Sequence, residues 1–167
     1  MPRPLGNSPY AFTVPSVEAV PAARARVVHR AQRLGLALDE ELTNDLRLLT
    51  GEVIANSVTH TQAACVVSVR WTGDRLRVEV TDSDPTLVGP SRAKAMDENG
   101  RGLFLVAALA TAWGSQPCVA GKNTWFELAV PASVEDAAAV PASQADAATG
   151  EPVSITSTHA GIEHQAA

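Results

Sequence analysis

Hydrophobic residues recur at helical spacing over residues 46–61, LRLLTGEVIANSVTHT. At about 100° per residue, one narrow stripe of this helix holds Leu46, Leu49, Val53 and His60. Further apolar residues fall on its other sides, which is typical of a helix enclosed by neighbours rather than lying on a surface. We therefore predict a central, largely buried helix.

Three polar residues follow the edge of that buried stripe. Glu52, Asn56 and His60 are spaced four residues apart, so their side chains stand one above the next along the helix. An unpaired polar group in such an enclosed position costs about 1–3 kcal/mol. We expect these side chains to face one another or a cavity, and a bound ligand is one candidate partner.

The chain before this helix predicts a short strand and a first helix. Residues 10–14 form the strand, Ser16 is a plausible N-cap, and residues 17–36 continue as a helix that ends at Gly35. Asp39 or a neighbour then caps the central helix. Four arginines are expected on one side of this helix: Arg24, Arg26, Arg30 and Arg33. We predict that this side is a solvated helix face, and the alternative is a partner-binding strip.

After residue 61 the periodicity changes from helix to strand. Residues 64–71 and 75–82 form two strands joined by a polar turn at 72–74. Strict alternation in RLRVEVTD places Asp82 on the same side as the apolar residues. A carboxylate there is costly unless it is paired or bound to a ligand. The alternative is that Asp82 leaves the sheet and caps the next loop.

A long irregular segment, residues 83–100, follows this strand; its SRAKAMDE stretch is compatible with one or two helical turns. Loops of this length in a compact domain are usually functional or disordered. The segment ends at Gly100-Arg101-Gly102, directly before the apolar helix LFLVAALATAW, which Gly114 would end. Bare N–H groups at a helix start suit a phosphate, although many such glycine turns bind nothing.

Two more strands complete the pattern. They are predicted at residues 115–120 and 124–130, joined by a turn at 121–123, and Thr124 shares the inward face of its strand. From Pro131 the chain is rich in Ala, Ser, Thr and acid and has no aromatic residue. The predicted organisation is a flexible N-terminus at 1–9, one domain at 10–131 and a disordered tail at 132–167.

Composition excludes several classes of function. The 167 residues are 46% hydrophobic and 19% charged, with a net charge of −5, which predicts no direct binding to nucleic acid. No apolar run spans a membrane and no signal peptide pattern is present, so we expect a cytoplasmic protein without a membrane partner. Cys65 and Cys118 lack metal-ligand spacing and are expected to be small buried hydrophobes.

Taken together, four sequence boxes resemble the GHKL ATP-binding superfamily, which includes histidine kinases and gyrase. The boxes are E-x-x-x-N-x-x-x-H from Glu52, the inward Asp82, GRGL at 100–103 and GKNTWFEL at 121–128. The chain is most similar to the small stand-alone branch of anti-sigma-factor serine/threonine kinases. This resemblance implies an α/β sandwich whose mixed, mostly antiparallel sheet is covered on one face by three helices.

The resemblance also implies roles for individual residues around ATP and Mg²⁺. Asn56 would coordinate Mg²⁺, and Glu52 would orient or deprotonate the attacking hydroxyl. Asp82 would accept a hydrogen bond from the adenine amino group, assisted by Thr124. The segment 83–99 would be the lid over the nucleotide. The residues near the phosphates would be His60, Gly100, Arg101, Gly102 and Leu103.

One departure from the family pattern is clear. The family's D-x-G-x-G box reads Asp82-Ser83-Asp84-Pro85-Thr86 here, so Asp84 stands where a glycine lets the backbone approach the base.

Two functions remain open at this point. One is a protein kinase that phosphorylates an anti-sigma-factor antagonist, sequesters a sigma factor, or both; the other is a catalytically silent, nucleotide-gated binding module. A homodimer is compatible with either, and an ATP-free scaffold is the remaining alternative.

Overall fold

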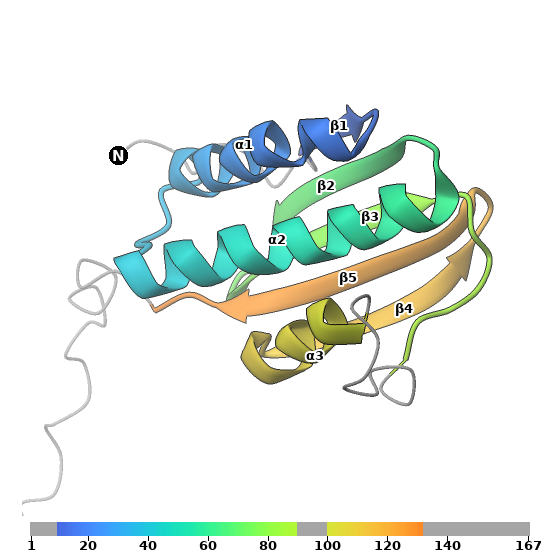
Figure 1. Cartoon of the computed structure of the whole chain (residues 1–167). Helices are drawn as coiled ribbons and strands as arrows, with labels where there is room; N and C mark the ends of the chain where they lie inside the picture. The colour runs from blue at the N-terminus through green and yellow to red at the C-terminus, as the bar shows by residue number, and fades with distance from the viewer. Residues whose placement is uncertain (1–9, 90–99, 132–167) are drawn as a thin grey trace, which may run out of the picture.

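The protein is a two-layer sandwich, with one sheet covered on a single face by helices (Figure 1). The computed structural model describes residues 10–89 and 100–131. In chain order, the elements are β1 (Tyr10–Val14), the 3-10 turn η1 (Val17–Ala19), α1 (Val20–Arg33), α2 (Glu40–Thr61), β2 (Cys65–Trp71), β3 (Arg75–Asp82), α3 (Gly100–Leu109), β4 (Ala112–Cys118) and β5 (Gly121–Ala129).

The five strands lie in the order β1-β2-β3-β5-β4, and all four pairings are antiparallel. The strands β3 and β5 are neighbours in the sheet although α3 and β4 lie between them in the sequence. The predicted α/β sandwich with a largely antiparallel sheet and three helices is confirmed. No parallel pair occurs among the described strands.

The core lies between α2 and the central strands. Leu46, Leu49 and Ile54 of α2 are fully buried, and they share one cluster with Val78 and Phe126 of the sheet. Burying one such side chain contributes about 1.5–3 kcal/mol. The prediction of an enclosed central helix is therefore confirmed.

Helix ends follow the predicted signals, except that no side chain caps the start of the first helix. Asp39 caps α2, because its Oδ1 accepts a hydrogen bond from the backbone N of Leu42 at 2.8 Å. Ser16 lies at the predicted N-cap position, at the start of the 3-10 turn that leads into α1, but its side chain makes no capping hydrogen bond. Gly35, at φ +76°, follows the end of α1 as predicted.

The boundary between α3 and β4 lies earlier than predicted. The helix ends at Leu109, and Gly114 lies inside β4, where it faces Trp125 across the strand pair. A Cβ atom at position 114 would lie 2.9 Å from Cζ2 of Trp125, so this glycine permits close packing of the indole. The prediction that Gly114 ends the helix is wrong, because β5 pairs with the residues just before it.

Two other predictions near this hairpin are corrected. The tripeptide 121–123 is the start of β5 rather than a turn, since Lys122 pairs with Asp82 in register. Cys118 is exposed, whereas Cys65 is buried as expected. The predicted lid helix at 91–98 and the tail at 132–167 lie outside the described residues.

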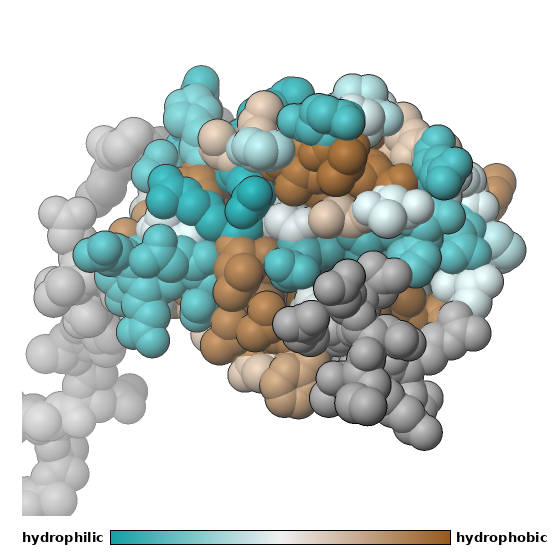
Figure 2. Space-filling view, viewed as in Figure 1, coloured by the Kyte–Doolittle hydropathy of each residue, from teal (hydrophilic) through white to brown (hydrophobic). Residues whose placement is uncertain are grey.

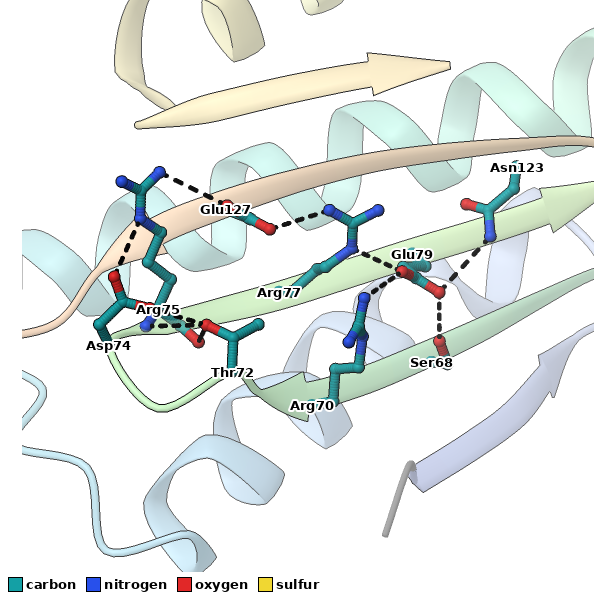
Figure 3. Close-up of polar contacts among 9 residues, drawn as sticks. All are labelled: Ser68, Arg70, Thr72, Asp74, Arg75, Arg77, Glu79, Asn123 and Glu127. Carbon is teal, nitrogen blue, oxygen red and sulfur yellow. Dashed lines mark hydrogen bonds and ion pairs between the residues drawn. The ribbon is translucent and has the colours of Figure 1, made fainter. Parts of the chain in front are cut away.

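The face of the sheet opposite the helices carries a network of charged side chains (Figure 3). Arg77 on β3 lies at its centre and pairs with Glu79 and with Glu127, the latter at 2.8 Å. Arg77 also stacks over the ring of Trp125, with its Cζ 3.8 Å from the ring centroid. Within the described residues, no helix has both the length and the hydrophobicity to cross a membrane.

Candidate functional site

The polar edge of α2 meets the first turn of α3. Glu52 and Asn56 are both half-buried on α2. Glu52 lies directly against Gly102, and a Cβ atom at position 102 would overlap the Glu52 carboxylate. This contact brings together the acidic residue of the E-x-x-x-N-x-x-x-H box and the GRGL box. The carboxylate also lies at the positive end of the α3 dipole.

On its other side, Glu52 lines an open cavity of about 250 Å³ between the start of α1 and α2. Arg24 of α1 lies across Gly51, where an added Cβ atom would be 2.9 Å from the arginine Cδ. Arg24 is therefore half-buried against α2. The solvated face that the sequence predicted does not include this residue. Glu52 separates this opening from the start of α3.

Asp82 closes β3 and points into the core layer, as predicted. Its side chain is fully buried. Its Oδ1 accepts two hydrogen bonds, from Lys122 Nζ at 3.0 Å and from the backbone N of Asp84 at 3.0 Å. Its Oδ2 is buried and has no hydrogen-bond partner among the described residues. Both earlier alternatives hold in part, because Asp82 bonds to the next loop and still faces the core.

The Oδ2 oxygen of Asp82 is a strong acceptor that is buried from the solvent. An unsatisfied buried acceptor normally costs free energy, and for a charged group this cost exceeds the 1–3 kcal/mol typical of neutral groups. Such a group in a native structure calls for an explanation. A ligand that donates a hydrogen bond is one.

Thr124 lies next to Asp82 on the inward face of the sheet. It faces Val80, two residues before Asp82, and it is buried with 2% of its surface exposed. Its Oγ1 is 3.4 Å from Oγ of Ser115 on β4. The two hydroxyls and the carboxylate make a short polar patch at the end of an otherwise apolar layer.

The electrostatics of this patch extend to β2. Burial, together with the charge of Asp82, raises the pKa of Cys65 to about 11. The Cys65 thiol therefore remains protonated at neutral pH. It contributes packing beside Asp82 and no charge.

The remaining predicted site residues fall in different environments. Gly100 and Arg101 are the first residues of α3, and Leu103 in the same helix has a buried side chain. His60 is exposed near the end of α2, so its predicted place on a buried stripe is wrong. Residues 90–99 of the predicted lid lie outside the described part of the chain.

Sequence reasoning missed Lys122. Its side chain is 2% exposed and pairs with both Asp82 and Asp84. The sequence predicts a turn at the tripeptide Gly-Lys-Asn, and a turn assigns no inward position to its lysine. Extending the alternation of Thr124 and Phe126 back by one step would have placed Lys122 on the inward face.

The surface over these elements divides by chemistry. Figure 2 shows hydrophilic residues over much of α1 and α2 and a hydrophobic area over α3, where Phe104 is 57% exposed and Leu109 is 39% exposed.

Comparison with known protein families identifies a domain in this chain. Residues 14–124 match the histidine kinase-like ATPase domain, which covers more than half of the chain and reaches from the end of β1 to Thr124. A comparison with curated proteins finds no match. An ATPase domain implies ATP binding, and the buried acceptor of Asp82 and the glycines at the start of α3 fit that ligand. The chain belongs to the family of histidine kinase-like ATPase domains.

Proposed function

We propose that this protein binds ATP with Mg²⁺ and transfers its γ-phosphoryl group to a hydroxyl of an anti-sigma-factor antagonist, or holds a sigma factor in a nucleotide-dependent way. The observation that carries ATP binding is the buried Oδ2 of Asp82, which has no hydrogen-bond partner in the described part of the chain. It is the acceptor that the amino group of adenine requires. Thr124, beside it, assists at the base.

The other end of the nucleotide would meet the α2–α3 contact. The first backbone N–H groups of a helix suit phosphate oxygens, and Gly102 adds no side chain of its own to the first turn of α3. Asn56 offers an amide oxygen to Mg²⁺, whose other ligands would come from phosphates and water. ATP supplies the phosphoryl group, and the residues of this chain hold and orient it.

The kinase hypothesis depends on Glu52. It lies between the start of α3 and the open cavity beside α1, so an acceptor hydroxyl entering from the cavity would meet the carboxylate before the phosphate. Glu52 would take the hydroxyl proton as the new oxygen–phosphorus bond forms and the bond to the β-phosphate oxygen breaks, leaving ADP.

Calorimetric titration with ATP, with and without Mg²⁺, tests the binding step. Replacing Asp82 by Ala should weaken ATP binding by about 10- to 100-fold, the range for a lost hydrogen bond to a charged group. Asp74→Ala is a matched control, because Asp74 is an exposed carboxylate in the β2–β3 turn. An affinity that Asp82→Ala leaves unchanged would remove Asp82 from the base site.

Phosphate incorporation into a candidate antagonist tests the transfer step. Glu52→Ala should abolish phosphate incorporation while ATP binding is retained. Glu41 is an exposed acid on the same helix, and Glu41→Ala should leave both incorporation and ATP binding unchanged. The second candidate function is a silent binding module, favoured by Asp84 in the place of a glycine. It predicts ATP binding by the wild type without transfer to partner or water.

A further inference from the structure

The buried ammonium of Lys122 has all of its hydrogen-bonding capacity in use. A lysine has three donors. Those of Lys122 reach Asp82 Oδ1 at 3.0 Å, Asp84 Oδ2 at 3.0 Å and the backbone O of Asp84 at 3.3 Å. No donor is left over for the second oxygen of Asp82. The lysine is therefore bound to one side of that carboxylate.

The bonds to Asp82 are divided unequally between its two oxygens. Both protein donors, Lys122 Nζ and the backbone N of Asp84, go to Oδ1. A carboxylate rotates easily about its terminal bond, so two donors on one oxygen also set the direction of the other. The orientation of the free Oδ2 is thus determined by Lys122 and by the backbone of residue 84.

Asp84 in turn keeps the lysine in place. Its Oδ1 accepts from the backbone N of Thr86 at 2.9 Å, and its Oδ2 binds Lys122. If this second anchor were absent, the ammonium would be free to bridge both oxygens of Asp82. Asp84 stands where the family pattern has a glycine. Here a charged side chain that binds Lys122 therefore takes the place of a residue without a side chain.

We propose that Lys122 and Asp84 are positioning residues that select the base: they hold Oδ1 of Asp82 and keep Oδ2 available for the exocyclic amino group of a purine. The inference rests on the proposed function, because it concerns how the ATP site discriminates. It assigns the discrimination to an ion cluster rather than to backbone approach. Neither residue contacts the phosphates in this scheme.

The test compares two ligands that differ only at the base. ATP has the amino group, whereas purine riboside triphosphate has the same sugar and phosphates without it. By calorimetry, the wild type should prefer ATP by about 10- to 100-fold, as expected for one hydrogen bond to a charged acceptor. Asp84→Asn keeps the shape and the bond from Thr86 but weakens the hold on Lys122. It should bind ATP more weakly and purine riboside triphosphate unchanged.

Two further variants complete the design. Lys122→Met should bring the preference for ATP close to one, with folding checked by circular dichroism. Because this variant removes a buried charge, Asp84→Asn alone decides the matter if Lys122→Met does not fold. Asp74→Asn, an exposed acid in the β2–β3 turn, should leave both affinities unchanged.

The outcomes separate the inference from the function on which it rests. Equal loss of affinity for both ligands in Asp84→Asn, or a preference for ATP that remains at the wild-type value, would overturn the inference while ATP binding stands. A wild type that binds neither ligand would overturn the proposed function and the inference with it.

Discussion

The strands β3 and β5 carry a charged cluster on each face, and the two clusters differ in burial. On the helix side, Asp82 and Lys122 lie directly opposite each other and are almost completely buried. On the open side, Arg77, Glu79 and Glu127 retain between 12% and 18% of their side-chain surface. The same strand pairing therefore places one ion cluster inside the domain and one at its surface.

The two clusters also differ in how completely they are satisfied. On the open side, Glu79 accepts from Arg77 and Arg70; burial alone would raise the pKa of Glu79, but these arginines bring it below its usual value. On the helix side, one oxygen of Asp82 has no partner within the described chain. Buried ion pairs are weak contributors to stability. The comparison teaches that the described residues satisfy the acids of the open network, whereas the inner cluster keeps a buried acceptor for which we propose a ligand.

The largest expected effect is on the inner cluster. Lys122→Met should lower the free energy of unfolding by about 3–5 kcal/mol, because it leaves a buried carboxylate without its counter-charge. Urea denaturation measures the change. The double variant Asp82→Asn/Lys122→Met removes both charges and should recover much of the loss. A single-variant loss below about 1 kcal/mol would show that water reaches the pair.

Breaking the open network should cost less. Arg77→Ala removes two ion pairs and the stacking on Trp125, and we expect a loss of about 1–2 kcal/mol, since stacking and part-buried pairs each contribute up to about 1 kcal/mol. A double-mutant cycle with Glu127→Ala isolates the pair. Zero coupling would mean that the pair with Glu127 contributes nothing, and that the pair with Glu79 and the stacking account for the effect.

Acid titration sharpens the comparison at Asp84. The hydrogen bond from the backbone of Thr86, together with Lys122, lowers the pKa of Asp84 from 3.8 to about 2. The folded state therefore binds fewer protons than the unfolded state between these values, and stability falls as the pH drops from about 4 to about 2. In Asp84→Asn this part of the acid sensitivity should be missing from denaturation curves. Identical pH profiles would contradict the assignment.

The smallest effect is expected at the rim of the open network. Arg70 is 43% exposed and contacts Glu79 at 3.2 Å. Arg70→Ala should change the free energy of unfolding by less than about 0.5 kcal/mol, because solvent screens such a pair. Thermal melting in low and high salt measures it. A loss as large as that of Arg77→Ala would mean that the network acts as one unit.

Much of the fold was predictable where one periodicity dominated. Alternation in RLRVEVTD predicted β3 and the inward position of Asp82, because a strand has only two faces. The signal for the end of α3 was weaker. The run from Leu103 to Trp113 is apolar except for Thr111, and such a run is equally compatible with a helix and with a buried strand. Only the pairing with β5 places Trp113 in β4.

The site was predictable in its parts and less so in its connections. The four-residue spacing placed Glu52 and Asn56 along one edge of α2, where both are half-buried, and the contact of Glu52 with Gly102 joins two boxes that are 50 residues apart in sequence. Lys122 was missed because local turn preference and strand register disagreed there, and tertiary pairing decided in favour of the strand. The lid prediction at 90–99 falls outside the described residues.

The pairing of Asp82 with Lys122 also closes a long excursion of the chain. The two residues are 40 positions apart, and between them lie α3 and the edge strand β4. Gly121, at φ +141°, brings the returning chain against the backbone of residues 82 and 83. The segment between Asp82 and Lys122 therefore begins and ends at neighbouring points of the sheet. Grafting this segment between related domains should transfer the glycines at the start of α3 while the first three strands and both long helices stay in place.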